Sequence, residues 1–307
     1  MARWIWSRPA LQWSVALLAA STAIAHPARA ATPVLFAERW IDGTNGVEPA
    51  TQVQALDDDT FVIRQSVKTN FEAPFVYLLF GRDKALLIDT GAEDGNIRQT
   101  VDRLISDWLV RKKRADIPLI VAHSHSHGDH IAGDDAFRQR ANTTLVGLKP
   151  DEVANFFGIA KWPEQISRYE LGGRKLHILP TPGHQSAAIM VYDPKLRILL
   201  SGDTLYPGRL YVPVNFVADN RASVNRLSMF VARYPIRAVL GAHIEMSREK
   251  GRDYAHEAAA HPDEHPLELP VATIAELKAG MRASLDTPDE RQVHDDFIIV
   301  PVGARTE

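Results

Sequence analysis

The stretch Ser124-His125-Ser126-His127-Gly128-Asp129-His130 holds three imidazoles and a carboxylate within six positions. It follows the apolar run 118–122, so we expect it where a buried strand ends and a loop begins. Two histidines at i and i+2 project to one side of an extended segment. Imidazole and carboxylate groups at this density indicate a metal site. A chance cluster of such groups would be desolvated without compensation, which is unfavourable.

The composition is that of a globular protein. The chain has 307 residues, of which 45% are hydrophobic and 24% charged, which allows a large core. A formal net charge of -3 gives no general attraction for nucleic acid, so we expect a small-molecule substrate. The absence of cysteine removes thiolate from the possible ligands and agrees with export. Nothing in the sequence indicates the oligomeric state.

Residues 1–30 have the pattern of a cleaved secretory signal peptide. Arg3 and Arg8 precede an apolar segment over 13–25, and Ala28-Arg29-Ala30 supplies small residues where a signal peptidase reads. We expect cleavage after Ala30 and a periplasmic or secreted protein. The apolar segment is shorter than the ~20 residues of a membrane span, so an uncleaved anchor is the less favoured alternative.

Residues 31–307 are expected to form a single domain with a loop-helix appendage from about residue 245. Residues 31–60 are rich in Gly, Asp and Pro and predict little regular structure. Apolar runs predict strands at 61–63, 75–80, 85–88, 119–122, 175–179, 187–192, 196–200 and 238–240. Apolar residues at helical spacing predict helices that follow Asn96, begin at Pro150, surround Val224 and begin at a capping box of Thr273 and Glu276.

Three histidines outside the opening cluster fall in the segment 245–270, which is charged and contains proline, so we expect a loop or lid there rather than core. His256, His261 and His265 are therefore expected in a solvated loop, with an accessory metal site as the alternative. We expect His123, which precedes the cluster, to be a strand-end histidine bonded to the backbone.

Other strand-to-loop junctions also carry acids or histidines. His184 follows Thr181-Pro182-Gly183, Asp203 lies in Ser201-Gly202-Asp203-Thr204, and His243 follows Gly241-Ala242. Gly and Pro at these places allow tight turns that bring side chains to a common edge. Asp89 closes another predicted strand in Asp89-Thr90-Gly91.

This order of motifs resembles the metallo-β-lactamase superfamily, in which H-x-H-x-D-H precedes a distant His, an Asp in a Gly-Asp-Thr turn and a last His. The resemblance covers about 61–243 and implies an α/β fold, the four-layer αβ/βα sandwich, with metals where the loops of two sheets meet. It implies one ion bound by His125, His127 and His184, a second bound by Asp129, His130 and His243, and Asp203 bridging them. Two Zn²⁺ suit these ligands, and iron or manganese would also be tolerated.

The resemblance implies hydrolysis by a hydroxide that bridges the metals. Coordination lowers the pKa of water from ~15.7 toward ~7, so such a hydroxide can attack an ester, lactone, thioester or β-lactam carbonyl. Asp129 is expected to accept a hydrogen bond from the attacking water as well as to bind metal. Asp89 is expected to orient the ligand loops, with a simple turn role as the alternative.

Two residues beyond Asp203 are candidates for contact with the substrate. Tyr206 would point its hydroxyl at the substrate, as in the family's lactonases, or pack in a loop. Arg209 would bind a substrate carboxylate or remain at the surface.

Several functions are open within this family. A bridging Asp203 favours ester, thioester or lactone hydrolysis, because β-lactamases with an Asp-His second site generally lack it. Hydroxyacylglutathione hydrolases resemble the ligand set fully but carry a sizeable C-terminal helical domain, whereas 64 residues (307 minus 243) follow His243 here. The alternatives are an oxidoreductase similar to the mononuclear iron persulfide dioxygenases and a non-catalytic metal-binding module.

Overall fold

The computed structural model describes residues 1, 34–284, 286–287 and 289–303. The expected signal peptide and its cleavage site after Ala30 lie outside this part. Within the described ranges, no helix combines the length and the apolar character that crossing a membrane requires.

Two six-stranded sheets form the centre of the molecule. The first has the order β1 (Thr51–Asp57), β2 (Thr60–Gln65), β3 (Phe75–Phe80), β4 (Ala85–Ile88), β5 (Leu119–Ala122), β6 (Thr143–Leu145). The second has the order β13 (Glu268–Leu269), β12 (Ala238–Gly241), β10 (Ile198–Gly202), β9 (Ile189–Asp193), β8 (Lys175–Pro180), β7 (Ser167–Glu170). A smaller sheet joins β11 (Arg209–Pro213), β15 (Ile298–Val302) and β14 (Gln292–Val293).

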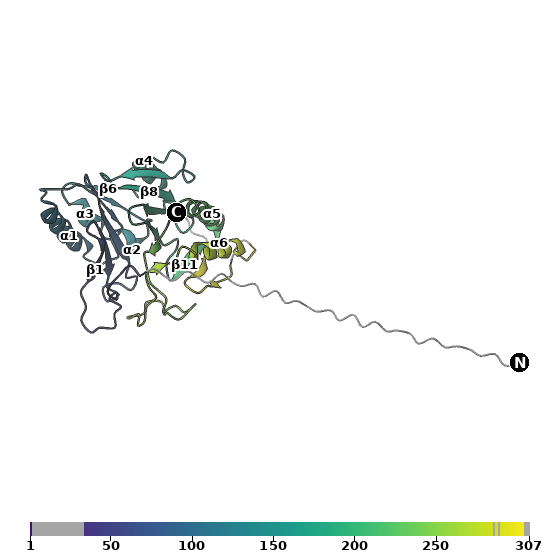
Figure 1. The fold of residues 1–307 in the computed structure, drawn as a ribbon. Helices are drawn as coiled ribbons and strands as arrows, with labels where there is room; N and C mark the ends of the chain where they lie inside the picture. The colour runs from purple at the N-terminus through teal and green to yellow at the C-terminus, as the bar shows by residue number, and fades with distance from the viewer. Residues whose placement is uncertain (2–33, 285, 288, 304–307) are drawn as a thin grey trace.

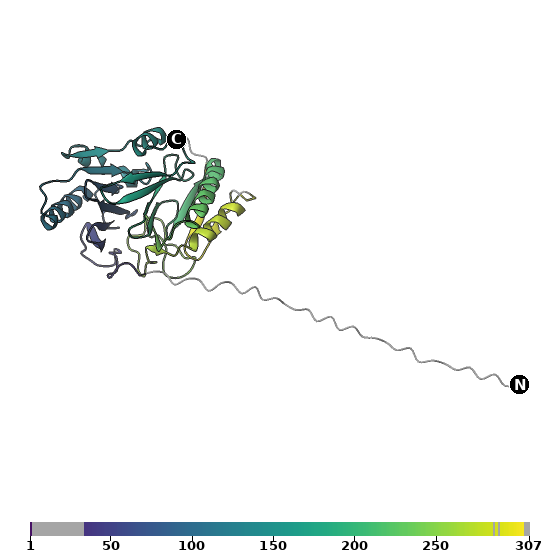
Figure 2. The ribbon, with the colours of Figure 1, turned by 45° about the horizontal axis from the view of Figure 1, so that its top comes forward.

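Helices cover the outer faces of these sheets. Figures 1 and 2 show α1 (Ile97–Lys112) on one side of the molecule and α5 (Val217–Val231) beside α6 (Thr273–Ala283) on the opposite side. Short helices α2 (Gly128–Ile131), α3 (Asp134–Arg138) and α4 (Pro150–Phe157) and a 3₁₀ turn (Val214–Phe216) lie in the connections.

Successive side chains along each strand pack into different hydrophobic clusters, which explains the layers of the fold. In β3, Tyr77 and Leu79 belong to a core shared with the second sheet, whereas Leu78 and Phe80 pack in the cluster that contains α1. In β9, Val191 faces the shared core and Tyr192 belongs to the cluster of α5 and α6. Successive side chains of a strand point to opposite faces, so each sheet buries both of its faces. The expected four-layer αβ/βα sandwich is confirmed.

Parallel pairing brings the candidate ligands to one edge. β4 pairs with β5 in parallel, and β10 pairs with β12 in parallel. The carboxyl ends of parallel neighbours lie at the same edge of a sheet. Asp89 and the opening cluster therefore leave the first sheet together, and Asp203 and His243 leave the second sheet together.

Three local predictions were wrong. Residues 51–57 form strand β1, which pairs with β2, although we expected little regular structure there. The last helix has Ala272 rather than Thr273 at its N-cap, with no side-chain cap, so the capping box is absent from this described helix. The segment 245–270 is not only loop, because it contributes β13 and buries Met246 and Leu267 completely.

Candidate metal centre

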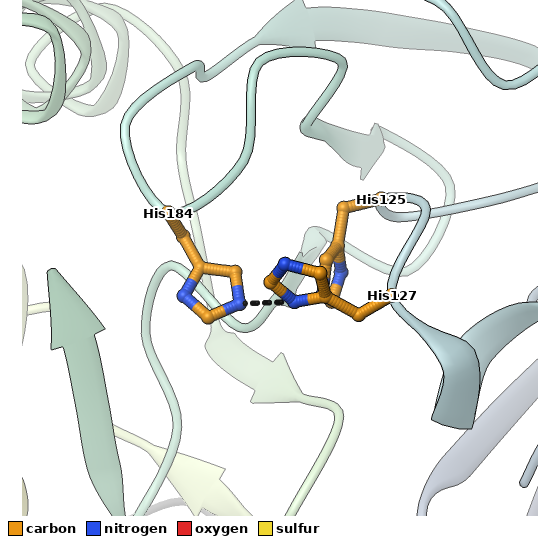
Figure 3. A group of neighbouring side chains, drawn as sticks. All are labelled: His125, His127 and His184. Carbon is orange, nitrogen blue, oxygen red and sulfur yellow. Dashed lines mark hydrogen bonds between the residues drawn. The ribbon is translucent and has the colours of Figure 1, made fainter. Parts of the chain in front are cut away.

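Three histidines form the first group of potential ligands. His125 and His127 lie between β5 and α2, and His184 lies in the loop after β8. Nδ1 of His127 is 2.9 Å from Nε2 of His125 and 3.0 Å from Nε2 of His184. Figure 3 shows the three rings converging from these two loops. His125 and His184 are buried, and His127 is half-buried, so the group has one side toward solvent.

The second group contains two carboxylates and two histidines. Oδ2 of Asp129 is 3.0 Å from Nε2 of His130 and 3.2 Å from Nε2 of His243. Oδ1 of Asp203 is 3.5 Å from the same atom of His130 and 3.4 Å from that of His243. The potential ligand atoms of this group all lie within 4.8 Å of one another, as do those of the first group.

Asp203 lies between the two groups. Its Oδ2 is 3.6 Å from Nε2 of His184 and 3.9 Å from Nε2 of His125, whereas its Oδ1 faces the second group. The turn that carries Asp203 follows β10 directly, and Gly202 has φ +51° and approaches Ser124 closely. One carboxylate therefore offers one oxygen to each group.

Hydrogen bonds behind the centre fix the orientation of the histidine rings. Nδ1 of His130 is 2.9 Å from Oδ2 of Asp89, which also accepts a 2.8 Å hydrogen bond from the hydroxyl of Ser124. Nδ1 of His184 donates to the carbonyl of Tyr211, and Nδ1 of His243 donates to that of Glu72, both at 2.8 Å. These contacts leave Nε2 of each ring facing the centre, the arrangement that metal-binding histidines adopt.

The histidines of the two groups differ in the direction in which their pKa values are shifted. Burial, together with the neighbouring His130 and His184, holds the pKa of His125 well below its usual value of 6.5. Burial also lowers the pKa of His243, but the carboxylates of Asp203 and Asp129 outweigh this effect and raise it well above 6.5. His130 is raised in the same way, with Asp129 as the main opposing charge, so its pKa also lies well above 6.5.

The donor set fits divalent cations. With Zn–N bonds of ~2.0–2.1 Å, the nitrogens of a tetrahedral site lie about 3.3 Å apart, close to the spacings within both groups. Oδ1 of Asp203 is buried and accepts no hydrogen bond from the described residues. A buried carboxylate oxygen without a donor is unfavourable unless a cation satisfies it. His125, His127 and His184 would hold one ion, and Asp129, His130, Asp203 and His243 a second.

The structure brings together all seven predicted ligands and places Asp89 where it orients His130. His123 differs from expectation, because its Nε2 contacts Oδ1 of Asp134 at 2.8 Å rather than the backbone. Asp134 also accepts a 2.9 Å hydrogen bond from the hydroxyl of Thr90. This buried trio lies behind the centre, because the amide of Thr90 donates to the carbonyl of His130.

Tyr206 and Arg209 do not point into the centre. The hydroxyl of Tyr206 donates to the carbonyl of Arg209, while its ring packs 5.3 Å from the ring of His243, centroid to centroid. This engagement argues against a catalytic hydroxyl and agrees with the packing alternative. The guanidinium of Arg209 pairs with Glu245 at 2.9 Å and Asp253 at 3.2 Å, so it is neither exposed nor directed to a substrate carboxylate.

Two of the three later histidines are not solvated. His261 is 5% exposed and contacts Glu264 at 3.2 Å, and His265 lies 3.3 Å from Asp296. His256 is exposed, as expected.

Sequence reasoning missed Glu72 and Tyr211, which position His243 and His184. Both act through backbone carbonyls, which every residue carries, so the residue type gave no signal.

Comparison with known proteins identifies the family. The model of the metallo-beta-lactamase superfamily matches residues 69–243. The chain is 26% identical over 225 residues to the acyl-coenzyme A thioesterase MBLAC2 of Bos taurus, covering 62% of this chain and 80% of that protein. It is 31% identical over 91 residues to the hydroxyacylglutathione hydrolase of Rhizobium meliloti, covering 29% of this chain but only 35% of that protein.

Solved structures agree on the fold. A metallo-beta-lactamase from Pontibacter korlensis superposes with a TM-score of 0.50 at 16% identity, covering 76% of this chain and 99% of that one. The mono-zinc form of the metallo-beta-lactamase FIM-1 from Pseudomonas aeruginosa gives a TM-score of 0.51 at 14% identity, covering 77% of this chain and 97% of that one. These structures agree on the fold alone, whereas the family model, which matches more than half of the chain, and the hydrolase relatives show that the chain belongs to the metallo-β-lactamase superfamily and is a metal-dependent hydrolase.

Proposed function

We propose that the protein is an exported hydrolase that holds two divalent cations, with zinc as the best fit, and cleaves a thioester or a related ester or lactone. The observation that carries this proposal is the position of Asp203, whose two oxygens face different ligand groups. A carboxylate shared in this way supplies negative charge between two ions that would otherwise repel each other. It supports a dinuclear site over a mononuclear one.

The chemistry of such a site is carbonyl hydrolysis. When bound, two divalent cations lower the pKa of a coordinated water from ~15.7 toward ~7 and polarise the carbonyl of the substrate. Asp129 is partly exposed, with a side-chain exposure of 20%, and its Oδ2 lies beside His130 and His243. It can therefore accept a hydrogen bond from the attacking water at the open side of the centre.

The need of the leaving group for a proton favours a thioester substrate over an oxygen ester. Burial raises the pKa of Tyr206 well above its usual value, and its hydroxyl is already engaged with the carbonyl of Arg209. Tyr206 is therefore a poor proton donor for a leaving alkoxide. A thiolate, with an ordinary pKa of about 8.5, leaves near neutral pH with less need of a proton. The name of the bovine relative, an acyl-coenzyme A thioesterase, supports the same choice.

Export is proposed on the sequence of residues 1–30 alone. An exported enzyme would meet neither glutathione nor coenzyme A in quantity, so the acyl group and not the thiol carrier is expected to be recognised.

A substrate panel tests the proposal. The mature protein, loaded with zinc, is assayed with a thioester, an aryl ester, a lactone and a cephalosporin, beside His125→Ala and Asp203→Ala. We expect thioester turnover to be the highest and both variants to lose it while keeping the circular dichroism of the wild type. Turnover in both variants equal to that of the wild type would remove the proposed site.

A further inference from the structure

A groove away from the metal centre lies between the edge of the second sheet and helix α5. It has a volume of about 320 Å³, near the lower end of small-molecule pockets, which run from roughly 300 to 1,000 Å³. None of the seven metal ligands lines it. It is lined by Glu164, Ile166, Arg168, His177, Arg226, Met229, Phe230, Arg233 and Tyr234.

The fold brings three guanidinium groups to this groove. Arg168 of β7 stands opposite His177 of β8 in the antiparallel register, so both side chains lie on the same face of the sheet. Arg226 lies on α5, and Arg233 lies in the turn just beyond the C-terminal end of that helix at Val231. The groove contains one carboxylate, that of Glu164, against these three cations.

The positive charge in the groove is only partly offset by carboxylates. Nη2 of Arg226 donates to the hydroxyl of Ser223 at 2.8 Å, but its Nε is buried and has no hydrogen-bond acceptor among the described residues. Burial lowers the pKa of Arg226, and the carboxylates of Glu164 and Asp219 offset that effect only in part. Burial and then Arg168 also lower the pKa of His177. Burial therefore disfavours the protonated forms of both Arg226 on α5 and His177 on β8.

Apolar surface lies beside these cations. Met229 and Ile166 are 67% and 37% exposed and line the groove together with the arginines. The ring of Tyr234 stacks on that of Phe230 with centroids 4.4 Å apart, and the guanidinium of Arg233 lies over the Tyr234 ring, 5.9 Å from its centroid. A ligand for this groove therefore needs an anionic part and an apolar or planar part.

We propose that this groove binds a phosphate ester that carries an apolar or aromatic portion. The planar fork of arginine matches the oxygens of a phosphate, and three such groups around one groove favour phosphate over a single carboxylate. The apolar portion would lie against Met229, Ile166 and Tyr234. The phosphate ester has two possible sources, a soluble nucleotide and the headgroup of an anionic phospholipid, which share this chemistry.

The test uses the mature zinc-loaded protein and two variants. Arg168→Gln/Arg233→Gln removes two exposed cations of the groove, and both positions tolerate the change because neither side chain is buried. Arg103→Gln, applied with Arg111→Gln on α1, is the control with the same change of net charge on the opposite side of the molecule. Adenosine monophosphate and adenosine are titrated by calorimetry, and vesicles of phosphatidylglycerol or phosphatidylcholine are tested by co-sedimentation.

We expect adenosine monophosphate or phosphatidylglycerol vesicles to bind, and the groove variant to bind at least about tenfold more weakly, since a charged hydrogen bond is worth ~1.5 kcal/mol or more. The α1 variant should bind as the wild type does. Nucleotide binding with loss in the groove variant assigns a soluble ligand, and vesicle binding with the same loss assigns a lipid headgroup. Binding of neither probe, or equal weakening in both variants, would overturn the proposal.

Discussion

Asp89 lies 2.9 Å from Nδ1 of His130 through its Oδ2, and His130 turns its other ring nitrogen to Asp129 at 3.0 Å. The carboxylate of Asp89 thus sets the direction in which a ligand of the second group points. Asp89 has φ +71°, a conformation that Asn also tolerates.

The contact between Asp89 and His130 predicts the behaviour of Asp89→Asn. We expect the second ion to bind about 10–100-fold more weakly, because partners that orient metal ligands have effects of this size. The measurement is a competition titration with a chromogenic chelator. Asp83→Asn, at an exposed turn, is the control and should leave the affinity unchanged. An Asp89→Asn protein that binds both ions as tightly as the wild type would show that this contact does not position His130.

The opposite pKa shifts of the two groups predict a pH dependence of metal content. Protons compete with metal for imidazole. Because the pKa of His125 is lowered and those of His130 and His243 are raised, protons compete more strongly at the second group. As the pH falls below neutrality, we expect the ion of the second group to be lost first. Metal content after dialysis at a series of pH values checks this order, and simultaneous loss of both ions would contradict it.

Gly183 predicts a steric effect next to His184. It has φ +149°, and a Cβ there would lie 2.3 Å from Cα of Asn220 on α5. We expect Gly183→Ala to lower the free energy of unfolding by about 1–3 kcal/mol, as overpacking does, and to weaken the first ion by displacing His184. Gly128→Ala is the matched control, because no atom lies within 4 Å of its added Cβ. Urea unfolding and metal titration of both variants provide the comparison, and equal behaviour would contradict the prediction.

A buried ion pair ties the segment after residue 245 to the first sheet. The guanidinium of Arg64 on β2 is fully buried and donates two hydrogen bonds to the carboxylate of Glu264. Glu264→Gln would leave that cation without a charged partner, which costs ~3–5 kcal/mol of stability in buried pairs. The exposed pair of Arg248 and Asp263 serves as the control. Arg248→Gln should change stability by less than ~1 kcal/mol, and similar losses in both variants would show that burial of the first pair is unimportant.

Much of the fold and the convergence of the seven candidate ligands could be predicted, because their signals are local. The strands of the core are apolar runs, and the candidate ligands lie in the loops that follow such runs, each of which contains a Gly. The order of these junctions carries the family resemblance.

The elements that were missed depend on distant partners. Strand β1 lies at the edge of the first sheet and buries few of its side chains. Polar residues are interspersed with its apolar ones, so its sequence shows no apolar run. Strand β11 pairs with β15, which lies about ninety residues later. His261 is buried because Glu264 beside it is held by Arg64, two hundred residues away in sequence. No local pattern contains these pairings.

The most direct test of the central claim is the metal content of the purified mature protein and of Asp203→Ala, measured by inductively coupled plasma mass spectrometry after saturation with zinc. The account predicts two zinc ions per wild-type chain and fewer in the variant, because Asp203 offers an oxygen to each group. One ion in the wild type, or two ions retained in Asp203→Ala, would contradict it.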